Sequence, residues 1–136
     1  ANILRSSPTT EVVIAGGVVR HSDGGIVGEA TIDFVRQFKV DYAVIGASAI
    51  DRDGTILDYD FREVKVSQAI ITHARKTILV ADVLKFERTA PVRIADFSMI
   101  DVLVTDVEPP KEIVDVCQRQ AVELVVTGES IAEAAA

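Results

Sequence analysis

The chain has 136 residues, 49% of them hydrophobic, so it can bury one core and we do not expect it to be disordered. Its 14 basic and 21 acidic side chains give a net charge of −7, which disfavours nucleic-acid binding by this chain alone. A single cysteine excludes an internal disulfide and a multi-cysteine zinc site, and it fits a reducing compartment. We expect no membrane span and no signal peptide. The chain starts at Ala1 rather than Met, so we expect a processed or truncated product.

Five short apolar runs predict strands. They are rich in β-branched residues, too short for helices, and apolar throughout, which is typical of strands covered on both faces. Each run stops at small or acidic residues. The runs are residues 11–15, 42–45, 77–81, 102–104 and 123–126.

Helical patterns lie between these runs. Apolar spacing predicts helices over residues 31–38 and 61–74, and a third helix that begins at Pro109-Pro110. Asp60 can cap the second helix, with Glu63 as the reciprocal partner of a capping box. Strand alternating with helix predicts an α/β fold in which flanking helices cover a mostly parallel sheet.

Two shorter features complete the predicted elements. Asp53-Gly54 is a tight-turn signal between extended pieces at 49–51 and 55–59, and residues 91–95 predict a further short strand. We expect residues 131–136 to be frayed. The sequence contains no internal repeat, linker or domain boundary.

Ligands of open α/β sheets bind at the carboxyl ends of the strands, which here carry small, hydroxyl or acidic residues. Arg20, three residues after Gly17, is a candidate for an anion, although it can equally pair with a surface carboxylate. Asp82 and Lys85 can hold a hydroxyl and a phosphate, or they can be a turn cap and a solvated lysine. Glu63 can bind ligand or serve only as a helix cap.

Other site chemistry is disfavoured. The glycine-rich stretch after Asp23 fits neither a phosphate-binding loop of nucleotide-binding proteins nor a dinucleotide fingerprint. His21 and His73 lack metal-ligand spacing, so we expect no metal and no cofactor. Cys117 lies on the apolar face of its helix, where packing is the expected role.

Five motifs in order across about 110 residues resemble the effector-sensing domain of DeoR-type bacterial transcriptional repressors. Within that family, the resemblance is strongest to repressors of the glycerol-3-phosphate regulon. The motifs are Ala15-Gly16-Gly17-Val18-Val19-Arg20; Gly28-Glu29-Ala30-Thr31; Ile45-Gly46-Ala47-Ser48-Ala49-Ile50-Asp51 with Gly54 and Glu63; Ala81-Asp82 with Lys85-Phe86; and Asp101 with Val104-Thr105-Asp106.

The resemblance implies a ribose-5-phosphate-isomerase-like fold in a cytoplasmic, homo-oligomeric repressor that is not an enzyme. A phosphorylated sugar or polyol, with glycerol 3-phosphate as the leading candidate, would weaken its binding to operator DNA. The winged helix-turn-helix and the opening sensor strands of such repressors have no match here. We therefore expect residues 1–136 to be the later portion of an incomplete sensor domain, which reaches DNA only through the missing part.

The resemblance also suggests the site residues. Arg20 and Lys85 would face the phosphate, and Asp51, Glu63 and Asp82 would accept ligand hydroxyls. The family pattern Asp-Ser-Ser-Lys-Phe-Gly reads Asp82-Val83-Leu84-Lys85-Phe86-Glu87 here, so two hydroxyls and a glycine are replaced. Ala49 and Val64 also depart from the usual Gly and Ala. The pocket lining would be Gly17, Gly46, Ala47 and Ser48.

Two alternatives remain open from the sequence. A sugar-phosphate isomerase with the same architecture could use carboxylates and a lysine for proton transfer. A fragment that binds no ligand could instead serve in self-association, because an incomplete parallel sheet leaves edges and apolar faces open.

Overall fold

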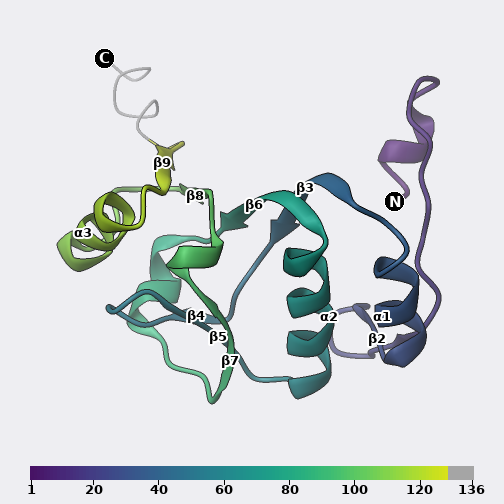
Figure 1. Ribbon diagram of the computed structural model, residues 1–136, viewed down its shortest axis with the longest axis horizontal. Coiled ribbons are helices and arrows are strands. Elements are labelled where there is room, and N and C mark those ends of the chain that lie inside the picture. The colour runs from purple at the N-terminus through teal and green to yellow at the C-terminus, as the bar shows by residue number, and fades with distance from the viewer. Residues whose placement is uncertain (129–136) are drawn as a thin grey trace.

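A four-stranded parallel sheet forms the centre of the computed structural model, which describes residues 1–128 (Figure 1). Its strand order is β3-β6-β8-β9, and every neighbouring pair is parallel. The predicted α/β fold with a mostly parallel sheet is therefore confirmed. The strands are β3 (Val40–Ile45), β6 (Ala74–Val80), β8 (Val102–Thr105) and β9 (Glu123–Val126). Residues 131–136, expected to be frayed, lie outside the described part.

Two of the predicted helices connect these strands. Helix α2 (Phe61–Thr72) lies between β3 and β6 in the chain, and α3 (Lys111–Arg119) lies between β8 and β9. Asp60 caps α2 as predicted, because its side chain accepts the backbone N–H groups of Arg62 and Glu63. The second contact of the predicted capping box, between the Glu63 carboxylate and the Asp60 backbone N–H, is wrong, because the carboxylate lies against Arg20 instead. The charge of the arginine competes successfully for that carboxylate.

An antiparallel sheet of order β4-β5-β7 packs beside the parallel one. Strands β4 (Ala49–Ile50) and β5 (Thr55–Asp58) form the predicted hairpin, and β7 (Val92–Asp96) is the predicted further strand. Gly54 has a φ of 89°, and a Cβ there would lie 2.8 Å from Val116 Cγ1 of α3, so the turn requires glycine. Short 3-10 helices are η2 (Val83–Glu87) and η3 (Phe97–Met99).

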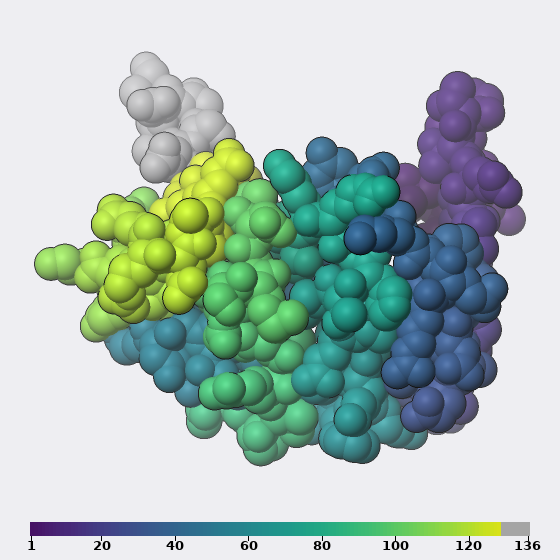
Figure 2. Space-filling view, viewed as in Figure 1, coloured from purple at the N-terminus to yellow at the C-terminus, as the bar shows by residue number. Residues whose placement is uncertain are grey.

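The predicted strand over residues 11–15 is wrong. These residues form no ladder, and the nearest strands are the two-residue β1 (Val18–Val19) and β2 (Ile26–Val27). A strand needs a neighbour for its N–H and C=O groups, and within residues 1–128 the edge strand β3 pairs only with β6. The preceding segment, with the 3-10 helix η1 (Leu4–Ser6), buries no side chain in that helix and projects from the body (purple in Figure 2).

Helix α1 (Glu29–Val35) is shorter than the predicted 31–38. Its Ile32 packs with Val66 and Ala69 of α2, while Phe38 lies beyond the helix end and is 46% exposed. The rings of Phe34 and Phe38 still contact each other, with centroids 5.1 Å apart. The helix thus joins α2 through a small second core.

One face of the parallel sheet is buried and the other is bare. The buried face supplies Ile45, Leu79 and Leu103 to a core shared with α2, α3 and the antiparallel sheet, and Cys117 is buried in it as expected. The prediction of strands covered on both faces is therefore wrong for the described residues, because the covering elements all lie on one side (Figure 1). The opposite face carries Tyr42, Val44, Ile78, Val80, Val102, Val104 and Val125, of which Tyr42 and Val44 are 63% and 66% exposed.

Candidate functional site

The carboxyl ends of the parallel strands meet at one edge of the sheet, as the strand-end pattern predicts. Gly46-Ala47-Ser48 follows β3 and Ala81-Asp82 follows β6, its neighbour. A Cβ added at Gly46 would meet nothing within 4 Å, so the edge is open there. A cleft of about 350 Å³ opens beside β6 and β8. Its lining is Val80, Ala81, Asp82, Lys85, Val104, Thr105, Asp106 and Thr127.

Helix η2 places Lys85 over this cleft. The Asp82 carboxylate accepts the Leu84 N–H at 3.0 Å, and the Lys85 N–H donates to the Asp82 carbonyl at 3.1 Å. Asp106, from the end of β8, accepts the Val83 N–H at 2.9 Å and ties the turn to the sheet. Lys85 is half-buried, and no carboxylate of residues 1–128 lies within 4.0 Å of its ammonium group. The cleft therefore contains a cation that can bind an anionic ligand, beside two carboxylates, Asp82 and Asp106, that each accept a backbone N–H.

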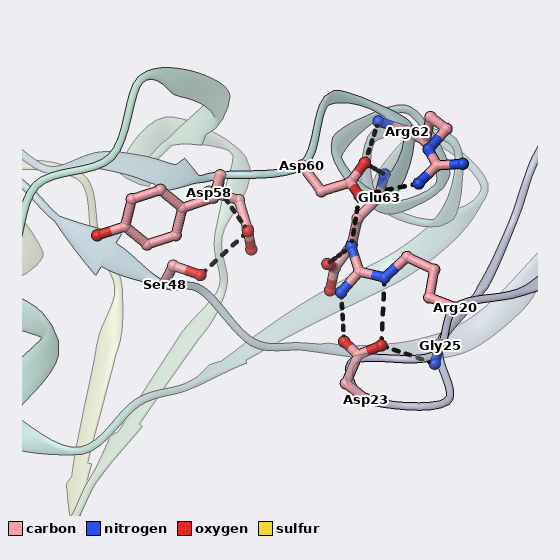
Figure 3. Close-up of polar contacts among 9 residues, drawn as sticks. Arg20, Asp23, Gly25, Ser48, Asp58, Asp60, Arg62 and Glu63 are labelled. Atoms are coloured by element: carbon pink, nitrogen blue, oxygen red, sulfur yellow. Dashed lines mark hydrogen bonds and ion pairs between the residues drawn. The ribbon is translucent and has the colours of Figure 1, made fainter.

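Arg20 lies among three carboxylates beside the N-terminus of α2 (Figure 3). Its guanidinium contacts Asp23, and Nη1 lies 2.9 Å from Asp60 Oδ2 and 2.7 Å from Glu63 Oε2. The arginine side chain is only 12% exposed. The contacts tie the β1–β2 turn to the N-terminus of α2. A phosphate at Arg20 would have to share the guanidinium with these carboxylates.

The pKa values of this cluster follow from the same contacts. The hydrogen bond to Asp23 raises the pKa of Arg20, with the charges of Glu63 and Asp60 adding to it. The pKa of Asp23 is lowered, chiefly by the Arg20 hydrogen bond, and that of Asp60 is lowered by the Arg62 N–H. Glu63 differs: burial raises its pKa, the nearby Asp58 charge raises it further, and Arg20 only partly opposes them.

Asp58 is the source of that nearby charge. It ends β5, is 8% exposed, and accepts the Ser48 hydroxyl at 3.0 Å and the Tyr59 N–H at 2.6 Å (Figure 3). The link joins the loop after β3 to the end of β5. Sequence reasoning missed Asp58, because a lone acid after a short apolar run gives no sign of being buried.

The other predicted site residues take separate places. Gly17 lies where a Cβ would come 2.1 Å from Thr31 Oγ1, so its glycine is required by packing. Asp51 is exposed at the β4–β5 turn, where its backbone bonds to Thr55. The structure thus brings Gly46, Ala47, Ser48, Asp82 and Lys85 to one strand edge and pairs Arg20 with Glu63 beside it.

Three polar residues that line the cleft were predicted from the sequence to end strands, but they were not predicted to bind the ligand. Thr105 is buried and donates its hydroxyl to the Val107 carbonyl at 2.7 Å, and Thr127 donates to the Thr105 carbonyl at 3.2 Å. The third is Asp106. Within residues 1–128, no three His, Cys, Asp or Glu side chains gather to hold a metal ion. No helix of that part is long and apolar enough to cross a membrane.

An α/β domain whose strand-edge cleft carries a lysine beside acidic and hydroxyl side chains fits a small-molecule sensor. Residues 1–107 match the family of DeoR C-terminal sensor domains, and the chain belongs to that family. It is therefore a sensor domain, and the relatives that it resembles are named as transcriptional repressors.

Three curated relatives are similar to this chain over more than nine-tenths of its length. It is 46% identical over 126 residues to the glycerol-3-phosphate regulon repressor of Haemophilus influenzae, covering 93% of this chain and 49% of that protein. It is 41% identical over 124 residues to the protein of the same name from Escherichia coli, covering 91% and 49%. The E. coli HTH-type transcriptional repressor CsqR is 34% identical over 129 residues, covering 95% and 49%. The chain thus spans about half the length of these relatives.

Proposed function

We propose that this domain senses a phosphorylated sugar or polyol, most specifically glycerol 3-phosphate, and relieves repression by a homo-oligomeric repressor of glycerol or sugar metabolism. The observation that carries the proposal is the half-buried Lys85, which lines the strand-edge cleft without an ion-pair partner in residues 1–128. The names of the relatives support the choice of ligand. A ligand of this kind changes operator affinity only through its different affinity for the DNA-binding and released states.

The positions of these residues support the following proposed roles. Lys85 binds the phosphate, while Asp82 and Glu63 accept hydroxyl groups of the ligand. Gly46, Ala47 and Ser48 provide room and backbone groups at the end of β3, where a Cβ added at Gly46 would meet nothing within 4 Å. Arg20 acts through Glu63, which it holds at 2.7 Å, and shares its charge with an incoming phosphate. Ligand contact by Asp51 stays a prediction, as does a ligand role for Gly17.

The bare face of the parallel sheet supports a further part of the proposal. Parallel sheets are covered on both faces, and this one has seven mainly apolar positions with no covering element in residues 1–128. We propose that the chain is the later portion of a sensor domain in a protein about twice as long. The remaining sensor strands and helices would pack on that face. A winged helix-turn-helix would contact operator DNA, in the cytoplasm.

The experiment is a measurement of operator affinity for the full-length protein, with and without phosphorylated polyols of three to six carbons. We expect glycerol 3-phosphate to weaken operator binding at concentrations where glycerol has no effect. The proposed function is refuted if every compound in the series leaves the operator affinity unchanged.

A further inference from the structure

Two carboxylates of the strand-edge cleft each keep an oxygen free. Asp82 and Asp106 line this cleft together with Lys85, and each carboxylate accepts one backbone N–H through Oδ1. No N–H or O–H group of residues 1–128 donates to Oδ2 of either residue. Both residues are exposed, so these two oxygens can accept hydrogen bonds from a ligand.

Most hydrogen-bond donors around the cleft are already used within the protein. The Thr105 hydroxyl donates to the Val107 carbonyl at 2.7 Å, and the Thr127 hydroxyl donates to the Thr105 carbonyl at 3.2 Å. The first three N–H groups of η2 all donate to the two aspartates. Among the side chains of residues 1–128 that line the cleft, the ammonium group of Lys85 therefore has the free donors, and no carboxylate of this part lies within 4.0 Å of it.

Asp106 is fixed in place from two sides. Its carboxylate accepts the Val83 N–H at 2.9 Å, which ties it to η2, and its backbone carbonyl accepts the Gly128 N–H at 2.6 Å, beyond the end of β9. A Cβ on Gly128 would collide with that carbonyl, so the second contact requires glycine. A carboxylate that is held before the ligand arrives costs little entropy to order on binding.

We infer that Asp106 makes the cleft selective for ligands that carry a single anionic group. The inference deepens the proposed function and rests on it. One phosphate is matched by Lys85, and hydroxyl groups of the ligand are matched by the free carboxylate oxygens. A second anionic group would meet the charge of a fixed carboxylate and no free donor of the η2 turn. The matching class is a monophosphorylated polyol or sugar, while phosphorylated acids and bisphosphates are excluded.

The test compares glycerol 3-phosphate with 3-phosphoglycerate, which has the same phosphate and carbon number but a carboxylate in place of the terminal hydroxyl. Calorimetric titrations use the full-length protein, as wild type and as Asp106→Asn. The amide keeps an oxygen for the Val83 N–H, removes the negative charge and replaces Oδ2 by an NH₂ donor. We expect the wild type to prefer glycerol 3-phosphate by at least about tenfold. In Asp106→Asn this preference should fall by about tenfold, because glycerol 3-phosphate loses an acceptor and 3-phosphoglycerate loses a repulsion.

The matched control is Asp101→Asn. Asp101 directly precedes β8 as Asp106 directly follows it, and its carboxylate likewise accepts one backbone N–H, that of Thr77 at 2.8 Å. It does not line the cleft, so the same loss of charge should leave the preference within about twofold of the wild type. Should Asp106→Asn fail to fold, Asp106→Ser makes the same comparison, since a serine hydroxyl can also accept a backbone N–H without a charge. That variant should also reduce the preference for glycerol 3-phosphate.

The outcomes separate the two proposals. Wild-type protein that binds neither compound refutes the proposed function and the inference with it. Wild-type protein that binds both compounds equally well, or a preference that is unchanged in the Asp106 variants, overturns the inference alone. Equal weakening of both ligands in those variants would likewise assign Asp106 a structural role only. An equal fall in preference in Asp101→Asn would trace the selectivity to net charge and would also overturn the inference.

Discussion

Replacing Lys85 by methionine removes the cation that lines the cleft in residues 1–128, while keeping a long, unbranched side chain. No carboxylate of residues 1–128 neutralises this ammonium group, so the substitution breaks no ion pair within the protein. The expected loss is that of the bond to the ligand phosphate. Hydrogen bonds to charged groups contribute about 1.5–3 kcal/mol, and each 1.4 kcal/mol is about tenfold in affinity. Because Lys85 is only half-buried, we expect the lower part of this range, a roughly 10- to 30-fold weaker Kd.

The assay is calorimetric titration of glycerol 3-phosphate into the full-length protein. The matched control is Lys39→Met, which makes the same change in net charge at an exposed position outside the cleft. The control should bind like the wild type. If Lys85→Met and Lys39→Met weaken binding equally, the effect is that of net charge, and the assignment of Lys85 to the phosphate is refuted.

Two further predictions concern the cluster around Arg20. Gly17→Ala should lower the free energy of unfolding by about 2 kcal/mol, the usual cost of overpacking, because its Cβ would collide with Thr31. Gly16→Ala, where a Cβ meets nothing within 4 Å, is the control in urea denaturation; equal midpoints for the two variants would contradict this prediction. The raised pKa of Glu63 means that the folded state binds its proton more tightly than the unfolded state does. The stabilisation that this tighter proton binding gives the folded state is therefore present below the unfolded pKa of about 4.3, and it is lost as pH rises through the folded pKa of Glu63. The Glu63→Gln variant has no such proton to lose, so its free energy of unfolding should rise relative to that of the wild type between pH 4 and 7. A stability difference that is constant over this range would show that the Glu63 pKa is not raised.

Local patterns predicted most of the fold because they report local physics. Apolar runs of β-branched residues predicted four parallel strands, and the Asp60 cap and the Asp53-Gly54 turn depend on neighbours a few residues away. Residues 11–15 have the same pattern as those strands but pair with no strand of the described part of the chain, residues 1–128. A strand depends on its neighbour as well as on its own sequence, and the neighbour cannot be read from the run itself.

The sequence predicted where the site lies, but it did not predict which charged side chains pair with each other there. Parallel strand ends share one edge whatever their register, so Ser48, Asp82 and Lys85 could be grouped from the sequence. The partners of Arg20 could not, because Glu63 is 43 positions away and the ion pair depends on how the β1–β2 turn packs on α2. Asp58 was missed for a related reason: its burial and its hydrogen bond to Ser48 depend on how the chain folds around it, which no local pattern records.

The central claim is that the domain binds a phosphorylated ligand at the strand edge, and a calorimetric titration tests it most directly. Glycerol 3-phosphate is titrated into the full-length protein, with glycerol as the control. We expect saturable binding of glycerol 3-phosphate and no binding of glycerol. The absence of both binding heat and thermal stabilisation with glycerol 3-phosphate would contradict its assignment as the ligand, with Val83 and Leu84, where the family has two serines, as the first positions to examine.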